Sequence, residues 1–151
     1  MNNNESNPVL QNTEPSASVN QYREQRIKNL QALEAMGYEP FGQAFDRTAR
    51  LKELRDPFEE GREVSAAGRL TSIRSMGKSV FADIYDGSAR MQLYVGKKSL
   101  TEDAFKAFGL LDMGDHIGVK GKLFTTRPGE KSIHVETWTL LSKAILQPPE
   151  T

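Results

Sequence analysis

The sequence contains no cysteine and only two histidines. Without cysteine there is no disulfide framework, no thiol nucleophile and no thiolate metal site. His116 and His134 lie far apart, and no second ligand stands near either at metal-binding spacing, so we expect no metal site. The sequence also lacks an apolar run of roughly 18 residues and a basic start followed by an apolar stretch. A soluble cytoplasmic protein that does not contact membranes is the expectation.

A net charge of one sign is lacking as well, because 20 Lys and Arg residues balance 20 Asp and Glu residues. The overall charge therefore gives no reason to expect a polyanionic partner. Between Arg62 and Lys98, however, basic residues outnumber acidic ones, which predicts a local basic surface. The length of 151 residues fits one domain with a core of moderate size.

The first 60 residues divide into a tail and a helical segment. Residues 1–18 are rich in Asn, Ser, Pro and Glu, a composition that predicts a disordered tail. Residues 19–60 are expected to be helical. The first helix is indicated by apolar residues at three- to four-residue spacing, which would form its buried stripe: Ile27, Leu30, Leu33 and Met36. A second helix is predicted at residues 47–55, with Asp46 as its N-cap and with Leu51 and Leu54 buried.

After Gly61 the spacing of apolar residues changes from a helical period to a period of two. Five strands are predicted, with a short helix at 101–108 between the third and fourth, at residues 63–75, 78–86, 89–95, 116–125 and 131–141. The inward phase of the first strand changes near Gly68, which predicts a bend or bulge there. The prediction for residues 61–146 is therefore a mainly β fold, a five-stranded OB-fold barrel, preceded by two N-terminal helices. The proline-rich residues 147–151 are interpreted as the start of a linker.

Residues 69–95 carry the strongest indication of function. In the second strand, Val80, Ala82 and Ile84 point one way, and Phe81, Asp83 and Tyr85 point the other. In the third strand, Met91, Leu93 and Val95 point inward, and Arg90, Gln92 and Tyr94 point outward. An exposed aromatic face flanked by Arg and Gln suits stacking on an unpaired base and reading its edge. The pattern alone also allows a free-standing single-strand binder, a sugar-binding barrel or a protein-interaction barrel.

Longer runs of sequence resemble one family. They are GRLTSIRSMGKSVFADI, ARMQLYV, LDMGDHIGVKGKLFTTRPGEKSIHV and TLLSKA. Together they resemble the N-terminal anticodon-binding domain of bacterial-type class II lysyl-tRNA synthetases, over residues 22–149. Aspartyl and asparaginyl relatives share the barrel, but the MGK turn and the FTTRPGEKS hairpin are similar to the lysyl branch.

The resemblance implies a site and a partner. It implies that the barrel grips the anticodon loop of lysine tRNAs, stacks the central uridine on Phe81 and reads it with Gln92, Arg74 and Glu130. Phosphate contacts are expected from four further cations: Arg69, Lys78, Arg90 and Arg127. No catalytic residue is expected here. The resemblance places the ATP- and magnesium-dependent lysine–tRNA ligase reaction in a separate C-terminal domain. It also implies a homodimeric parent protein, and we expect the isolated domain to be mostly monomeric.

Overall fold

The computed structural model describes residues 17–39 and 44–144. Most of the predicted tail and the predicted linker at residues 147–151 lie outside the described residues. The first described element is helix α2 (Ala17–Ala35). None of the helices in the described part of the chain is long and apolar enough to cross a membrane.

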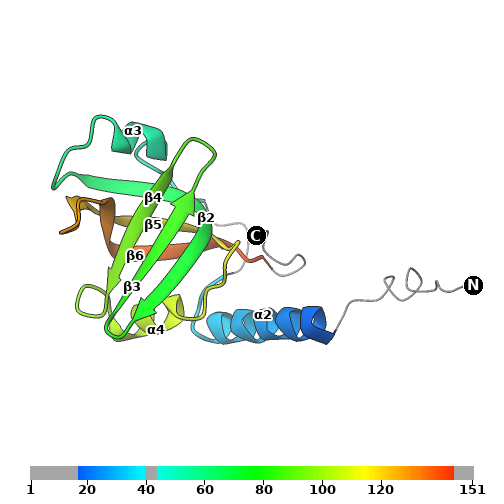
Figure 1. Cartoon of the computed structure of the whole chain (residues 1–151). Coiled ribbons are helices and arrows are strands. Elements are labelled where there is room, and N and C mark those ends of the chain that lie inside the picture. Colours follow the sequence, from blue (N-terminus) through cyan, green and yellow to red (C-terminus); the bar gives the residue numbers. More distant parts are fainter. Residues whose placement is uncertain (1–16, 40–43, 145–151) are drawn as a thin grey trace, which may run out of the picture.

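The main body is a closed five-stranded barrel, shown in Figure 1. Its strands are β2 (Glu63–Met76), β3 (Ser79–Tyr85), β4 (Arg90–Gly96), β5 (His116–Thr125) and β6 (Lys131–Ser142). They close in the order β2-β3-β4-β6-β5, and only the β4–β6 pair is parallel. Helix α4 (Glu102–Phe108) connects β4 to β5 and lies at one end of the barrel, while α3 (Leu51–Arg55) lies at the other. The predicted mainly β OB-fold with its inserted helix is confirmed.

Strand β2 belongs to both sides of the barrel. It pairs with β5 along Glu63–Arg69 and with β3 along Arg69–Met76, and its register shifts between Leu70 and Ser72. The predicted bulge therefore exists, but its position near Gly68 was wrong, because side chains alternate without interruption through Leu70. At Gly68 a Cβ would lie 3.0 Å from the carbonyl oxygen of Tyr85, so a side chain here would require the β3 backbone to shift by a few tenths of an ångström.

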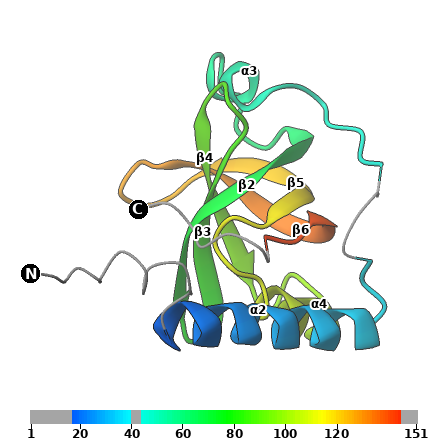
Figure 2. The same cartoon turned by 90° about the vertical axis from the view of Figure 1, so that its right-hand side faces the viewer.

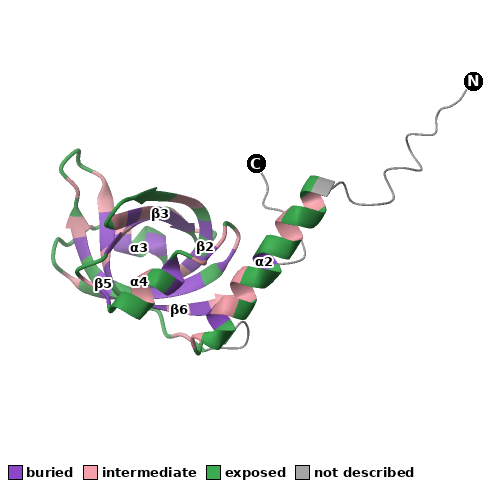
Figure 3. Ribbon diagram, turned by 90° about the horizontal axis from the view of Figure 1, so that it is seen from below, coloured by how far each residue is buried: buried purple, intermediate pink, exposed green. Residues whose placement is uncertain are grey.

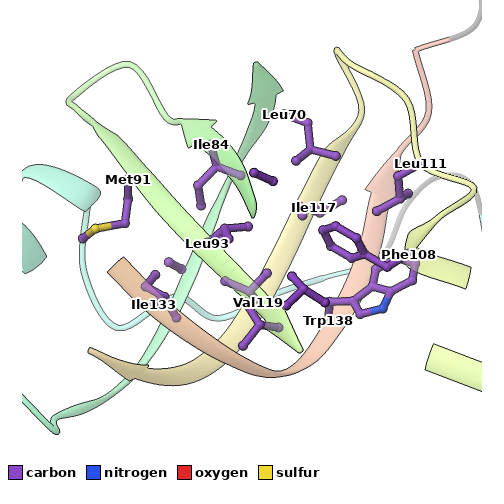
Figure 4. Packing of buried hydrophobic residues seen from close by; sticks show 14 of the residues in the cluster. Leu70, Ile84, Met91, Leu93, Phe108, Leu111, Ile117, Val119, Ile133 and Trp138 are labelled. Atoms are coloured by element: carbon purple, nitrogen blue, oxygen red, sulfur yellow. The ribbon is translucent and has the colours of Figure 1, made fainter. Parts of the chain in front are cut away.

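The core fills the barrel and closes at the α4 end. The inward phases predicted for the strands are confirmed, since Val80, Ile84 and Leu93 all belong to the buried core cluster. Figure 4 shows Ile84 and Leu93 within this cluster. Phe108 of α4 meets Trp138 of β6 edge to face, with ring centroids 5.5 Å apart. Figure 3 shows α4 across this opening of the barrel. Because the interior is filled with side chains, any ligand must bind on the outer surface.

Helix α3 is shorter than predicted and is capped from another part of the chain. It begins after Arg50, so Asp46 is not its N-cap. Residues before it are held extended, because Thr48 exchanges two hydrogen bonds of 2.8 Å with Ser65 of β2. The N–H of Leu51 donates instead to Asp86 in the β3–β4 turn at 2.9 Å. Leu51 and Leu54 are buried, as predicted.

The Asp86 carboxylate joins that turn to α3. Burial works to raise its pKa, but hydrogen bonds from the N–H of Leu51 and from the hydroxyl and N–H of Ser88 outweigh burial and lower the pKa. Asp86 is therefore ionised in the folded protein at neutral pH and stabilises both segments through charge-assisted hydrogen bonds.

Helix α2 runs along the α4 end of the barrel, as Figure 2 shows, and its attachment is largely polar. Its predicted apolar stripe is confirmed in part: Leu33 is fully buried and Met36 packs against the core, but Ile27 is 37% exposed. Arg26 is buried instead, and its guanidinium donates to the carbonyl oxygens of Met113, at 2.7 Å, and Ala144. Apolar periodicity could not reveal this, because the buried side chain is an arginine.

A buried ion-pair cluster lies beside α2, where β6 ends. The Lys143 ammonium is 2.6 Å from both the Asp112 and the Asp115 carboxylates, and the Asp115 side chain is fully buried. Burial raises the pKa of the Asp115 carboxyl, while the hydrogen bond from Lys143 opposes that rise. The cluster fixes the last described residues of the barrel against the loop that follows α4.

Candidate nucleic-acid interface

An open groove of about 420 Å³ crosses the outer face of the barrel, between the β2–β3–β4 sheet and the β5–β6 hairpin. Its lining residues come from β2, β3, β4 and the hairpin, and they are Arg74, Met76, Phe81, Gln92, Thr126, Pro128, Gly129 and Glu130. All four residues predicted to read a base therefore lie on one groove. Arg74 and Glu130 are separated in the sequence by three strands and a helix, and the closure of the barrel brings them together.

Strand register explains how these side chains meet. Arg74 of β2 is paired with Phe81 of β3, and on the adjoining row Asp83 of β3 is paired with Gln92 of β4. The parallel β4–β6 pair then sets Ser132 beside Gln92. Since outward residues on paired strands share a face, the pairing creates two neighbouring rows of functional side chains.

Phe81 is half-buried and is not part of the hydrophobic core. Its ring is tilted by 57° against that of Tyr94, with centroids 5.3 Å apart. Tyr94 in turn meets His134 and Phe124 edge-on, at 5.1 Å and 5.9 Å. The Tyr94 ring packs against one side of the Phe81 ring, and Phe81 also lines the groove. A flat ligand in the groove can therefore stack on the Phe81 ring.

Gln92 is more enclosed than a solvated strand residue, with 9% of its surface exposed. Its Nε2 donates to the Ser132 hydroxyl oxygen at 2.9 Å. Its Oε1 accepts from the Arg74 guanidinium at 3.3 Å. The amide is therefore held from both ends, and Arg74 reaches the groove as part of the same contact.

Two carboxylates organise the cations around the groove. Asp83 receives hydrogen bonds of 2.7 Å from the Arg90 guanidinium and from the Ser72 hydroxyl, and its other neighbour is Arg74 at 3.9 Å. Arg90 also lies 3.7 Å from the Glu130 carboxylate. Asp83 therefore orients basic side chains, and the Arg90 cation partly offsets the negative charge of Glu130.

None of the four predicted phosphate contacts lines the groove, although Arg90 lies beside its lining residue Glu130. Lys78 lies in the β2–β3 turn and Arg127 in the β5–β6 hairpin, so both stand on segments that border it. Arg69 lies on the distant half of β2, beside His116. There, burial first and the Arg69 charge second lower the pKa of the His116 imidazole.

The sequence prediction did not include four residues that line the groove, which are Met76, Thr126, Pro128 and Gly129, nor Ser132, which does not line the groove but contacts Gln92. Met76 is 62% exposed at its rim, and Ser132 is fully buried beneath Gln92. Ser132 has the outward phase in its strand, which is a usable sequence indication. Its proximity to Gln92 depends on the parallel β4–β6 pairing, which no local pattern reveals.

Comparison with known proteins identifies the class. The tRNA anticodon family model, described as an OB-fold nucleic acid binding domain, matches residues 64–141. The chain belongs to this family of OB-fold nucleic-acid-binding domains. The match covers every strand of the barrel and all the groove residues.

More particularly, the chain is similar to lysine–tRNA ligases. It is 42% identical over 127 residues to that of Moorella thermoacetica, covering 83% of this chain and 26% of the relative. It is 40% identical over 134 residues to that of Pelotomaculum thermopropionicum, covering 87% and 26%. With that of Thermoanaerobacter pseudethanolicus the identity is 39% over 150 residues, covering 97% and 30%. The predicted resemblance to lysyl-tRNA synthetases is confirmed, and the chain spans less than a third of these curated relatives.

Proposed function

We propose that this domain binds the anticodon loop of lysine tRNA and recognises its central uridine in the groove. The observation that carries the proposal is the meeting of Phe81, Gln92, Arg74 and Glu130 on one groove, from segments far apart in the sequence. The family match to an OB-fold nucleic-acid-binding domain and the names of the lysine–tRNA ligase relatives support the same reading.

Each of the four side chains suits a distinct part of an unpaired base. The Phe81 ring stacks on its face, an interaction typically worth about 1–3 kcal/mol per base. The Gln92 amide can donate and accept at once, and the Arg74 guanidinium can only donate. Glu130 can only accept when ionised, so it suits a base N–H rather than a phosphate. Its distance of 3.7 Å from Arg90 reduces its repulsion of the RNA backbone.

The flanking cations supply affinity without sequence preference. Lys78 and Arg127 stand on the two turns beside the groove, and Arg90 borders it through Glu130. Phosphate contacts of this kind strengthen binding at low salt and position the loop, whereas the base contacts select it. Arg69 is the most distant of the four proposed cations and would contact phosphates outside the loop's central nucleotide.

We further propose that the whole protein is a lysine–tRNA ligase of which this chain forms the anticodon-binding part. In this proposal the ligase reaction takes place in a separate domain, which uses ATP and magnesium. The proposal includes a homodimeric parent in the cytoplasm and a mostly monomeric isolated domain. The chain's coverage of less than a third of its relatives is consistent with a second, larger domain.

The test is a titration of the 151-residue chain with the anticodon stem-loop of lysine tRNA, with and without a change of its central uridine. We expect the native loop to bind about tenfold more tightly or better, because an unpaired buried polar group costs about 1–3 kcal/mol. Equal affinity for both loops would indicate a single-strand binder without sequence preference. No binding even at low salt, where the electrostatic contribution is largest, would favour a protein-interaction barrel.

A further inference from the structure

Behind the groove lies the fully buried side chain of Ser132 in β6, whose hydroxyl contacts the groove residue Gln92. We propose that Ser132 is a positioning residue that fixes the orientation of the Gln92 amide and thereby makes the groove prefer uracil to cytosine. This inference rests on the proposed function, since it concerns how the same groove tells two pyrimidines apart.

The hydrogen bonds of Ser132 leave only one role for its oxygen. A serine hydroxyl has a single proton to donate. Ser132 donates that proton to the backbone carbonyl of Glu130, at 3.2 Å. Its oxygen must therefore accept from Gln92, and the atom of the Gln92 amide that can donate is Nε2, 2.9 Å away. The hydroxyl selects the nitrogen end of the amide.

Arg74 imposes the same orientation from the other end. A guanidinium has five N–H donors and no acceptor, so it can face only an oxygen of the amide. The Arg74 Nη2 lies 3.3 Å from Gln92 Oε1. If the amide were rotated by half a turn, its nitrogen would face the guanidinium and its oxygen would face the Ser132 lone pairs. Both contacts would then be repulsive.

The β5–β6 hairpin fixes the direction in which the Ser132 hydroxyl donates its proton. The Glu130 carbonyl that receives it also accepts from the N–H of Thr126 at 3.0 Å. The N–H of Glu130 donates to the Thr126 hydroxyl, also at 3.0 Å. These bonds hold the Glu130 carbonyl in place, so the direction of the Ser132 hydroxyl follows from the fold of the hairpin.

A fixed amide discriminates between pyrimidines. Gln92 retains one further donor and one further acceptor beyond its contacts with Ser132 and Arg74. Uracil has an N3–H donor beside carbonyl acceptors, so its N3–H can pair with Oε1 and a carbonyl with Nε2. Cytosine has an N3 acceptor beside an amino donor, which requires the opposite orientation of the amide. With the base held against Phe81, the fixed orientation favours uracil.

The test compares the affinity ratio for two stem-loops, with uridine and with cytidine at the central position. In the unsubstituted chain we expect a preference for uridine. In Ser132→Ala we expect the uridine-to-cytidine ratio to fall by roughly fivefold to tenfold, because one orienting hydrogen bond is lost. Ser142→Ala removes a hydroxyl from the other end of the same strand and should leave the ratio unchanged.

The outcomes separate this inference from the proposed function. A chain without substitution that binds both loops equally would refute the proposed reading of uridine, and this inference with it. An intact preference for uridine that survives unchanged in Ser132→Ala would refute only the role of Ser132. A weaker affinity for both loops with a constant ratio counts as the same refutation, because it shows a structural effect alone.

A second measurement needs no variant. It determines the orientation of the Gln92 amide directly, and it therefore tests the proposal even if Ser132→Ala does not fold. In the isotope-labelled chain, nuclear Overhauser contacts report which residues lie near the side-chain amide protons of Gln92. We expect contacts from those protons to the β-protons of Ser132. Contacts to the Arg74 guanidinium protons in place of Ser132 would show the opposite amide orientation and would overturn the proposal.

Discussion

Phe81 provides a sharp test, because a stacking ring and a core ring respond differently to truncation. Phe81 lies outside the buried cluster and its ring contact is with Tyr94, at 5.3 Å. We therefore expect Phe81→Ala to lower the free energy of unfolding by only about 1 kcal/mol. Loss of a base stack should cost about 1–3 kcal/mol of binding. That corresponds to an affinity for the anticodon stem-loop lower by about 5- to 150-fold.

Two control variants show how loss of an exposed ring and loss of a core ring should behave. Tyr85 is on the same strand and the same outward face but is 49% exposed and does not line the groove, so Tyr85→Ala should leave both stability and binding nearly unchanged. Phe108 is 1% exposed in the core, so Phe108→Ala should destabilise the fold by about 3–5 kcal/mol. Calorimetric unfolding and a fluorescence titration measure the two quantities. The reasoning is refuted if Phe81→Ala unfolds as readily as Phe108→Ala and the folded fraction binds normally.

Three further predictions concern charge. Asp86→Ala should destabilise the fold by about 2–3 kcal/mol through lost charge-assisted hydrogen bonds. Because the folded pKa of Asp86 is lowered, this contribution is complete above the ordinary pKa of 3.8 and is lost as the pH falls through the folded pKa. Lys143→Ala should cost about 3–5 kcal/mol by leaving the buried Asp115 unpaired, and adding Asp115→Asn should recover part of that loss. Lys78→Ala should weaken binding equally for native and uridine-substituted loops and reduce the salt slope by about 0.7.

Each of these has a clear contrary result. A stability difference between the unsubstituted chain and Asp86→Ala that persists unchanged in strong acid would show that the carboxylate charge is not the cause. Additive losses for Lys143→Ala and Asp115→Asn in urea unfolding would show that the two groups do not interact. A Lys78→Ala variant that changes the preference between loops would show that Lys78 contacts a base.

The strands were predictable because burial leaves a period of two in the sequence. The inward residues Val80, Ile84 and Leu93 were assigned correctly from that period alone. The helical segment was harder, because α2 buries Arg26 as well as Leu33, while Ile27 is exposed. A helix that is attached through a buried, hydrogen-bonded arginine shows no apolar periodicity at that position in the sequence.

The contacts among the candidate site residues were harder to predict than the residues themselves, whose binding of a base stays a prediction. Phe81 and Gln92 were proposed from strand phase and family resemblance, and Arg74 from the resemblance alone, and all three line one groove. Ser132 was missed, because its contact with Gln92 depends on a parallel pairing between strands separated by a helix and a third strand. The cap of α3 by Asp86 was missed for a similar reason, since the two residues belong to different parts of the chain.

Photochemical crosslinking tests the central claim most directly. The anticodon stem-loop of lysine tRNA is prepared with 5-iodouridine at the central position, bound to the chain and irradiated, and the crosslinked peptide is identified by mass spectrometry. Because a stacked aromatic ring is the favoured partner of this base, the account predicts a crosslink to Phe81. A crosslink from the central position to a residue outside the groove, with Phe81 crosslinked only when 5-iodouridine is placed at a flanking position instead, would contradict it.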